Sequence, residues 1–536
     1  MAEHHHQTIE RSCDVAVVGG SAAGLAAALQ LARQGRSVIV VDDGAPRNAP
    51  AAHMHGYLGR EGAPPSELIA IGRDEVRSYG GEVLTGRVLG VHPLDHSTHR
   101  FRVELTGGHA LLTRRVLAAT GLVDELPDIP GVAEHWGGDV IHCPFCHGFE
   151  VRDRRLVQIV THPMGLHPTP LLRHLAGHLT VVVHDTDGVD RDTLDALATG
   201  GTDVVLAPAR RVVTSGNDRV AGVELADGRT LPADAVVVGP RFRVRADVFA
   251  PTGLRTTPHP SGIGEVVEVD PTGRTTVDGL YAAGNVTDPG LQVLHAAAHG
   301  SRVGAMIAFS LADEDLFSGT RPSGEENDWD HRYADELPMW SGNPNGTLVH
   351  EAADLIPGRV LDIGAGEGGD AVWLAEQGWQ VTATDISARA LARVTAETRR
   401  RGLDVECLHR DANALRPFAP GAYDLVSMQY GAVHRTPDQR GVHNLLAAVA
   451  PGGTLLVVGH DLTPMSEPVD VATATRMFDP DAYIGIDEMA AALHRSPDWK
   501  VEVHETRPRP PGAVSTHHVD DVVLRAYRLD DEVEVP

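Results

Sequence analysis

The chain has 536 residues, 42% of them hydrophobic and 22% charged, with a formal net charge of −27 at pH 7. A chain of this length is too long for one hydrophobic core, so we expect about two to four domains. The acidic balance argues against nucleic acid and against anionic membranes as partners.

The first predicted unit is a βαβ unit close to the N-terminus. Residues 14–18 are typical of a buried strand, the turn 19–24 is followed by an alanine-rich helix to residue 34, and residues 37–41 are typical of a second strand. The mostly apolar stretch 15–31 is interrupted by glycines, so a strand, a turn and a helix explain it better than a membrane span. The polar residues 1–11 carry no signal-peptide pattern, and four cysteines are too few for a secreted disulfide framework. We therefore expect a soluble, cytoplasmic protein.

The turn of this unit is similar to the dinucleotide-binding fingerprint Gly-x-Gly-x-x-Gly, with a serine at the second glycine position. Small residues there let the backbone approach a pyrophosphate, which would rest on the helix N-terminus. An aspartate about twenty residues further on is placed to accept hydrogen bonds from ribose hydroxyls. Because such turns also occur without ligands, this motif alone leaves a purely structural role open. The candidate cofactor-binding residues are Gly19, Gly20, Ser21, Ala22, Gly24 and Asp42.

Two of the four cysteines, Cys143 and Cys146, form a Cys-x-x-Cys motif that is followed directly by His147. This spacing lets two thiols close a small disulfide ring and tends to place the first near a helix N-terminus, where the helix dipole stabilises a thiolate. A zinc site that also uses His142 is an alternative, but four ligands within six residues make poor geometry for structural zinc. The string also matches a c-type haem attachment site, for which we find no export signal. We therefore expect a redox-active pair and no metal.

Residues 126–238 are predicted to form a second α/β unit, with strands near 156–160, 179–183 and 235–238. The loop after its first strand, residues 161–168, contains a single glycine and two prolines. Prolines remove N–H donors that would otherwise face a phosphate, so this loop is a poor nucleotide-binding turn.

A third motif, residues 276–285, ends in Ala-Ala-Gly-Asn and contributes Gly284 and Asn285 as candidate cofactor-binding residues. Together with the first fingerprint and the Cys-x-x-Cys, it resembles the low-molecular-weight thioredoxin reductase family over residues 12–316. This resemblance implies bound FAD, with Asn285 in place of the family's usual acid beside the ribityl and phosphate groups.

The same resemblance implies roles for the cysteine pair. Cys146 would exchange electrons with the flavin, and Cys143 would react with the substrate. His147 stands where the family has an aspartate, and an imidazole with an unperturbed pKa near ~6.5 can shuttle the thiol proton at neutral pH. The family uses NADPH, but the loop at 161–168 leads us to expect NADPH to be a poor reductant here. A histidine after the pair resembles the dithiol oxidases of gliotoxin- and holomycin-type pathways, which close a disulfide in a small molecule and pass electrons to oxygen.

A second set of nucleotide-type motifs begins near residue 359. Residues 360–368 are a strand followed by Gly-x-Gly-x-Gly, and the next strand, 380–384, ends in an aspartate. Three further strands follow: the first ends at residues 409–412, the second spans 423–427, and a Pro-Gly-Gly turn at 451–453 introduces the third. Their order and spacing resemble the class I S-adenosylmethionine-dependent methyltransferases. In this resemblance the glycines approach the methionine moiety, one aspartate binds the ribose and another the adenine amine. The candidate residues are Asp362, Gly364, Gly366, Gly368, Asp385 and Asp411.

Upstream aromatic residues, Trp329, Tyr333 and Trp340, resemble the lead-in of thiopurine- and tellurite-type methyltransferases. They are equally compatible with a lid over the sulfonium methyl group, by cation–π attraction among other contacts, and with a role in the core. Methyl transfer to a thiolate needs mainly positioning and a deprotonated acceptor, so no dedicated base is expected.

The predicted fold class is α/β: two Rossmann-like domains of a thioredoxin reductase-like module followed by a Rossmann-like methyltransferase domain. The expected boundaries are 1–125 with 239–316 for the FAD domain, 126–238 for the domain with the cysteine pair, 317–328 for a linker and 329–536 for the methyltransferase.

We expect an FAD-dependent dithiol/disulfide oxidoreductase joined to an S-adenosylmethionine methyltransferase, with a small-molecule dithiol or disulfide and a small thiol acceptor as partners. One alternative is an NADPH-dependent thioredoxin-disulfide reductase fused to a methyltransferase of unrelated substrate. Another is a flavin redox sensor that regulates the methyltransferase. The sequence leaves the oligomeric state open, with a homodimer as one option.

Overall fold

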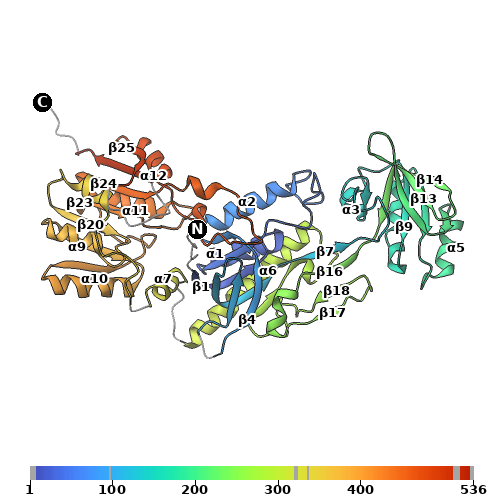
Figure 1. Ribbon diagram of the computed structural model, residues 1–536, viewed down its shortest axis with the longest axis horizontal. Helices are drawn as coiled ribbons and strands as arrows, with labels where there is room; N and C mark the ends of the chain where they lie inside the picture. Colours follow the sequence, from blue (N-terminus) through green and yellow to red (C-terminus); the bar gives the residue numbers. More distant parts are fainter. Residues whose placement is uncertain (1–7, 96–97, 319–323, 335–336, 511–519, 531–536) are drawn as a thin grey trace, which may run out of the picture.

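The computed structural model describes residues 8–95, 98–318, 324–334, 337–510 and 520–530. Three α/β bodies lie in a row: a C-terminal domain in gold to red, an N-terminal domain in blue and yellow-green, and a cysteine domain in green (Figure 1). The expected α/β fold class is confirmed.

The N-terminal domain is built on a seven-stranded sheet in the order β3-β2-β1-β6-β5-β4, with β19 paired to β6. The strands around β1 are parallel, whereas β4, β5 and β6 form an antiparallel meander. Its elements are β1 (Glu10–Val18), α1 (Ala22–Arg33), β2 (Val38–Asp42), α2 (Pro65–Arg77), β3 (Glu82–Thr85), β4 (Val88–Pro93), β5 (Phe101–Leu105), β6 (Ala110–Ala118), η2 (Asp247–Thr252), β17 (Thr256–Pro258), β18 (Glu265–Val267), β19 (Leu280–Ala282), η3 (Gly284–Val286) and α6 (Val293–Ser318).

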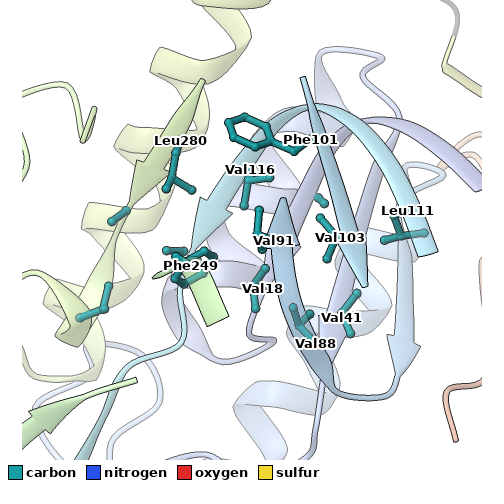
Figure 2. Packing of buried hydrophobic residues seen from close by; sticks show 14 of the residues in the cluster. Val18, Val41, Val88, Val91, Phe101, Val103, Leu111, Val116, Phe249 and Leu280 are labelled. Carbon is teal, nitrogen blue, oxygen red and sulfur yellow. The ribbon is translucent and has the colours of Figure 1, made fainter. Parts of the chain in front are cut away.

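Both faces of this sheet are buried, as expected for parallel strands. On one face, Val18, Phe101 and Phe249 belong to one apolar cluster (Figure 2). On the other face, α1 and α6 pack over Val15 and Val17. Neighbouring residues of β1 thus point to opposite faces, and both faces take apolar side chains.

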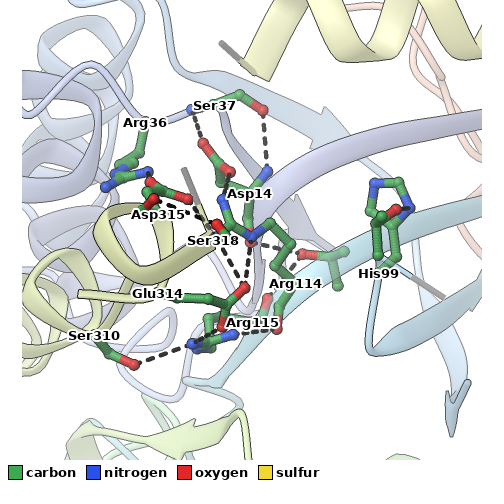
Figure 3. A network of polar contacts seen from close by, with 12 residues as sticks. Asp14, Arg36, Ser37, His99, Arg114, Arg115, Ser310, Glu314, Asp315 and Ser318 are labelled. Atoms are coloured by element: carbon green, nitrogen blue, oxygen red, sulfur yellow. Dashed lines mark hydrogen bonds and ion pairs between the residues drawn. The ribbon is translucent and has the colours of Figure 1, made fainter. Parts of the chain in front are cut away.

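The C-terminal end of α6 is tied to the sheet by a network of arginine and carboxylate side chains (Figure 3). Arg114 donates to Asp14, Glu314 and Asp315, with the shortest N–O distance 2.6 Å to Asp315. Arg36 binds the other oxygen of Asp315 at 2.5 Å, and all these groups are at least partly buried. The network fixes where the chain leaves the N-terminal domain.

The cysteine domain has a five-stranded parallel sheet, β11-β10-β9-β15-β8, and a three-stranded sheet, β12-β13-β14. The chain enters and leaves it through the paired strands β7 (Leu122–Glu125) and β16 (Arg241–Val244), which lie between the two bodies (Figure 1). Its elements are β8 (Val140–Ile141), α3 (Pro144–His147), β9 (Arg155–Val160), η1 (Pro163–Leu166), α4 (Thr169–Leu175), β10 (His178–Val183), α5 (Arg191–Thr199), β11 (Asp203–Leu206), β12 (Ala209–Thr214), β13 (Val220–Leu225), β14 (Thr230–Pro232) and β15 (Ala235–Val238).

The C-terminal domain has a seven-stranded sheet in the order β22-β21-β20-β23-β24-β26-β25. The first five strands are parallel, and β26 and β25 close the sheet as an antiparallel hairpin. Its elements are α7 (Gly324–Arg332), α8 (Gly346–Ala352), β20 (Arg359–Ile363), α9 (Gly369–Glu376), β21 (Gln380–Asp385), α10 (Ala388–Arg401), β22 (Val405–His409), β23 (Tyr423–Gln429), α11 (Arg440–Ala448), β24 (Val449–His460), η4 (Thr463–Ser466), η5 (Pro480–Ala482), α12 (Ile486–His494), β25 (Trp499–Pro508) and β26 (Asp520–Arg528).

The C-terminal domain is docked on the N-terminal domain through a buried ion cluster. Arg11 on β1 donates to both carboxylate oxygens of Glu82, at 2.9 and 2.6 Å. It also donates to Asp328 of α7 at 3.0 Å and to the carbonyl of Met477 at 3.1 Å. The Met477 side chain is part of the apolar cluster of the N-terminal domain. The two domains therefore share both a polar cluster and a core residue.

The segment expected to be a linker, 317–328, is largely helical where it is described. Helix α6 runs to Ser318 and α7 starts at Gly324, while residues 319–323 lie outside the described residues. Asp328 is buried and also accepts from the backbone N–H of Ser12 at 2.7 Å. The acidic residue Asp328 of this segment is therefore part of the ion-paired interface between the N- and C-terminal domains.

Candidate functional site

A cavity of about 790 Å³ lies between the N-terminal and cysteine domains. Helix α3, which contains Cys146 and starts directly after Cys143, is on the side of the cysteine domain that faces the N-terminal domain (Figure 1). The cavity brings together the sequence-predicted residues Gly19, Gly20, Ser21, Ala22, Asp42, Cys143, Cys146, His147, Gly284 and Asn285. Gly24 is buried behind this lining, in the first turn of α1.

Glycines form a narrow cradle at the start of α1. A Cβ on Gly24 would overlap the carbonyl oxygen of Gly19, and a Cβ on Gly20 would lie 2.7 Å from the Cβ of Asp42. Gly19 has a φ of +109°, which a residue with a Cβ rarely adopts. The turn is therefore open to a ligand at its backbone and closed to side chains, which fits a pyrophosphate at a helix N-terminus.

Asp42 lies at the end of β2 with an arginine that sequence reasoning missed. It accepts from the Gly20 N–H at 3.3 Å and forms an ion pair with Arg73 of α2. The Nε of Arg73 is buried and has no hydrogen-bond partner among the described residues. A buried, unpartnered donor beside the cradle fits an additional polar ligand. Arg73 belongs to a helix outside the fingerprint, so no sequence motif marks it.

Asn285 is held by the turn that follows it. Its amide nitrogen donates to the carbonyls of Asp288 at 3.1 Å and Leu291 at 2.9 Å. Its acceptor oxygen is therefore the group left to face a ligand hydroxyl. Gly284 has a φ of +81°, and a Cβ there would lie 2.7 Å from the Cβ of Ala23. This turn is packed directly on the start of α1.

The two cysteines form a disulfide with a Cα–Cα distance of 5.3 Å. Cys143 is the N-cap residue of α3, as the spacing predicts, and both sulfur-bearing residues are half-buried. Burial lowers the pKa of His147, although the charge of Glu150 opposes this. Its Nδ1 is buried without a hydrogen-bond partner in the described part of the chain. His147 is thus a mainly neutral imidazole at pH 7, ready to accept a proton.

Aromatic side chains line the same cavity as the cysteine pair. His142 stacks on Trp136 at a centroid distance of 5.5 Å and meets the edge of Phe242 at 6.4 Å. Burial, with a contribution from Arg47, lowers the pKa of His142 to about 4. This imidazole is therefore neutral in the physiological range and serves as an apolar wall of the cavity.

The loop expected to be a poor nucleotide turn is closed by side chains. It forms η1, and Gln158 of β9 donates to the carbonyl of Gly165 at 2.6 Å. Gln158 also accepts from the hydroxyl of Thr169 at 2.9 Å, at the start of α4. Prolines 168 and 170 flank that threonine, so this helix start offers few N–H donors to a phosphate.

The carboxyl edge of the C-terminal sheet carries the second set of predicted residues. Gly364, Gly366 and Gly368 all have positive φ values, 68°, 53° and 88°. Asp385 accepts from the N–H of Gly366 at 2.9 Å and from that of Ser387 at 2.8 Å. Asp385 therefore shapes the glycine loop.

Three buried carboxylates lie near one another behind this loop. Burial raises the pKa of Asp362 strongly, and Asp370 and Asp385 raise it further. Burial also raises the pKa of Asp370 to about 6 and that of Asp385. One oxygen of Asp362 is buried with no hydrogen-bond partner within the described ranges. A cationic ligand, such as a sulfonium with an ammonium group, would relieve this repulsion.

Asp411 lies just after β22 and is exposed, and it accepts from the N–H of Asn413 at 2.7 Å. Because β22, β21 and β20 are adjacent and parallel, Asp411, Asp385 and the glycine loop share one edge of the sheet. The structure thus brings all six predicted residues of this domain to the same region.

The aromatic lead-in covers the glycine loop. Tyr333 is buried, and its hydroxyl accepts from the indole N–H of Trp340 at 3.1 Å. A Cβ on Gly366 would lie 3.2 Å from that hydroxyl. Glu367 accepts from the N–H of Trp340 at 2.9 Å, which ties the lead-in to the loop. Tyr333 therefore belongs to the core, and Trp340 lies over the loop with half of its surface exposed.

Comparison with known proteins gives two family matches. Residues 13–300 match the pyridine nucleotide-disulphide oxidoreductase family, and residues 360–453 match a methyltransferase domain family. No helix in the described ranges has both the length and the apolar character needed to cross a membrane.

The chain is 31% identical to thioredoxin reductase aclD of Aspergillus oryzae over 282 residues, 51% of this chain and 88% of that protein. It is 28% identical to thioredoxin reductase tcpT of Claviceps purpurea over 283 residues, 51% of this chain and 86% of that protein. Among solved structures, HlmI matches with 41% identity and a TM-score of 0.54, covering 59% of this chain and 96% of HlmI. An oxidoreductase from Agrobacterium tumefaciens matches with 34% identity and a TM-score of 0.52, covering 56% of this chain and 99% of that one.

Proposed function

Because the chain belongs to the pyridine nucleotide-disulphide oxidoreductase family and carries a methyltransferase domain behind it, we propose that it is a bifunctional sulfur enzyme. Its first half oxidises a small dithiol through FAD and the Cys143–Cys146 pair. Its second half transfers a methyl group from S-adenosylmethionine to a thiol. The observation that carries the first assignment is the single cavity that contains both the glycine cradle and the cysteine pair.

FAD bound in the cradle would supply two-electron acceptance from a dithiol and reoxidation by oxygen. A substrate thiolate attacks the sulfur of Cys143, and the bond to Cys146 breaks. The second substrate thiol then displaces Cys143, so the substrate leaves as a disulfide and the enzyme holds two thiols. FAD bound beside Cys146 would accept the two electrons of this exchange, and oxygen would take them on together with the two thiol protons, as hydrogen peroxide. His147 accepts one of those protons, because its lowered pKa keeps the imidazole neutral.

NADPH is expected to be a poor reductant of this flavin. The closed loop around Gln158 and the prolines beside Thr169 offer a nicotinamide pyrophosphate few donors. Anaerobic stopped-flow reduction by NADPH, by NADH and by dithiothreitol tests this directly. We expect bleaching by the dithiol and only slow bleaching by either nicotinamide.

Reduction by NADPH at rates of enzyme turnover, about 1–10³ s⁻¹, would show that the protein is a reductase in the usual direction. Absence of bleaching by any of the three reductants would remove the dithiol assignment. Monitoring hydrogen peroxide after oxygen is admitted identifies the terminal acceptor.

Gly24→Val is expected to release FAD. The new side chain would overlap the Gly19 carbonyl and push the cradle out of shape. Purified wild type should be yellow, and the variant should lose most of its flavin on gel filtration. Gly216→Ala is the matched control, because nothing lies within 4 Å of a Cβ at that position. A variant that keeps its full flavin content would contradict the cradle assignment.

Asp385→Ala is expected to weaken S-adenosylmethionine binding by about tenfold or more, because a charge-assisted hydrogen bond contributes roughly 1.5–3 kcal/mol. Part of this loss comes from the Gly366 N–H, which loses its acceptor. Calorimetry on the full-length protein measures the affinity, and Asp424→Ala serves as a control outside the glycine loop. Unchanged affinity in the variant would discard the ribose assignment.

A further inference from the structure

The loop between β2 and α2, residues 43–64, lines the same cavity as the cysteine pair. Met54 in this loop is buried, and its backbone carbonyl accepts from the N–H of Gly62 at 2.9 Å. Gly56 has a φ of +73°, and a Cβ there would lie 3.4 Å from Oε1 of Gln292. Met54, His55 and Gln292 all belong to the cavity lining. The ordered backbone of the loop therefore holds His55 at the cavity wall.

Glu61 fixes the orientation and the tautomer of His55. Its Oε2 accepts from the N–H of Gly56 at 2.8 Å, and its Oε1 lies 2.7 Å from Nδ1 of His55. The hydrogen bond from His55 and then that from Gly56 hold the pKa of Glu61 below its usual value. Because an ionised carboxylate only accepts, Nδ1 of His55 carries the proton of this bond. Nε2 is therefore the basic nitrogen of a neutral His55.

This basic nitrogen faces the cysteine domain. Nε2 of His55 lies 3.5 Å from Oε1 of Glu150, in the turn that follows α3. Burial lowers the pKa of His147, the charge of Glu150 opposes this effect, and the charge of His55 adds to it. Glu150 thus lies near both imidazoles. A carboxylate at this distance from Nε2 favours the protonated form of His55.

Dithiol oxidation releases more protons than one imidazole can hold. The substrate gives up two thiol protons, one for each sulfur that enters the exchange with the Cys143–Cys146 disulfide. With His147 as the single acceptor, the first proton would have to leave before the second could be taken. A second basic imidazole in the same cavity removes this requirement.

We propose that His55 is the second proton acceptor of dithiol oxidation, with Glu61 as the residue that orients it and Glu150 as the carboxylate that stabilises its charged form. This inference rests on the dithiol oxidation proposed above and adds to it a group from the N-terminal domain. One substrate S–H proton goes to His147 and the other to Nε2 of His55, directly or through one water.

The exchange balances in protons and electrons. The two substrate sulfurs form one S–S bond, the Cys143–Cys146 bond breaks, and its sulfurs take up the electron pair. Oxygen is the final oxidant, as in the proposed function, and its reduction to hydrogen peroxide consumes two protons. His55 and His147 therefore both end the cycle neutral.

The test compares His55→Ala, Glu61→Gln and the control His92→Ala in the full-length protein, with dithiothreitol as the dithiol and oxygen uptake as the measure. His92 also pairs with a carboxylate, Glu104 at 3.3 Å, but does not line the cavity. We expect His55→Ala to lower turnover by about 10²-fold, as for loss of one proton-transfer group. His92→Ala should leave turnover unchanged, and flavin content should match the wild type in all three variants.

Glu61→Gln tests the tautomer while the imidazole is still present. The N–H of Gly56 needs an acceptor, so the amide oxygen of the variant would turn to it and the amide NH2 would face Nδ1 of His55. Nδ1 would then accept, the imidazole proton would sit on Nε2, and Nε2 could no longer take a proton. We expect turnover to fall about as far as in His55→Ala.

Added imidazole gives a readout that a purely structural role would not move. A small base can enter the space left in His55→Ala, so imidazole should restore part of its turnover. It should change neither the wild type nor Glu61→Gln, in which His55 still fills the site.

The outcomes separate this inference from the proposed function. Wild-type protein whose flavin is not bleached by dithiothreitol refutes dithiol oxidation and this role with it. Dithiol turnover that His55→Ala leaves unchanged refutes the role of His55 alone. Loss of flavin in that variant, or a loss of turnover that imidazole does not reverse, would show that His55 only supports the loop and would also overturn the inference. Normal turnover in Glu61→Gln would remove the orienting role of Glu61.

Discussion

Cys146→Ser is expected to stop electron transfer between dithiol and flavin, with turnover falling by roughly 10³-fold or more, as for loss of an essential nucleophile. Serine at position 146 cannot form the disulfide with Cys143, and this disulfide is the group that the substrate thiolate would reduce. Cys143→Ser should give the same loss of turnover while leaving a thiol at position 146. Oxidation of dithiothreitol, followed by oxygen uptake, measures both.

His147→Ala should reduce the same turnover by about 10²-fold, which is typical of losing one proton-transfer group.

For the two cysteine variants, Cys407→Ser is the matched control, because Cys407 forms no disulfide and lies in the C-terminal domain. Normal turnover in both single-cysteine variants of the pair would remove the disulfide mechanism altogether.

Arg11→Ala is expected to lower the free energy of unfolding of the N-terminal domain by about 3–5 kcal/mol, as for a buried ion pair that loses one partner. The change leaves Glu82 and Asp328 buried next to each other without the guanidinium that binds both. It also removes the donor to the Met477 carbonyl. Release of flavin fluorescence during urea unfolding reports the transition.

The matched control is Arg229→Ala, which breaks an exposed ion pair with Asp227 and should not change the midpoint. Arg11→Ala should also make the junction between the N- and C-terminal domains more sensitive to limited proteolysis, because Arg11 contacts Asp328 and the Met477 carbonyl across it. An unfolding midpoint of Arg11→Ala equal to that of the wild type would mean that the two domains are not held by this cluster.

Local patterns carried most of the information that the sequence held about the site. The glycine turns at 19–24 and 364–368, the cysteine pair and the strand-ending aspartates are encoded by neighbouring residues. These motifs can be recognised from a short stretch of sequence, because the small residue, thiol or carboxylate that each needs falls at a fixed spacing from its neighbours. The family matches confirm the expected oxidoreductase and methyltransferase halves.

Contacts between distant residues were beyond that reach. Arg73 meets Asp42 from a helix 31 residues away, and Arg509 reaches His460 across 49 residues of chain. Arg11 contacts the Met477 carbonyl across 466 residues. The acidic stretch at 317–328 has the composition of a linker, yet Asp328 is buried because its partner Arg11 comes from another domain. Composition predicts whether a segment favours solvent exposure, but contacts with residues distant in the sequence decide whether it is buried.

Met477, which belongs to the C-terminal part of the chain, packs in the apolar cluster of the N-terminal domain, so this cluster can be completed only late in synthesis. The N-terminal domain leaves the ribosome first, but the residue that completes its apolar cluster is made 466 positions after Arg11. At typical translation speeds this interval lasts about 20–90 s. During that time Arg11 can bind Glu82 but not the Met477 carbonyl, and the apolar cluster of the N-terminal domain lacks Met477. The N-terminal domain thus reaches its final packing only after most of the C-terminal domain has been synthesised.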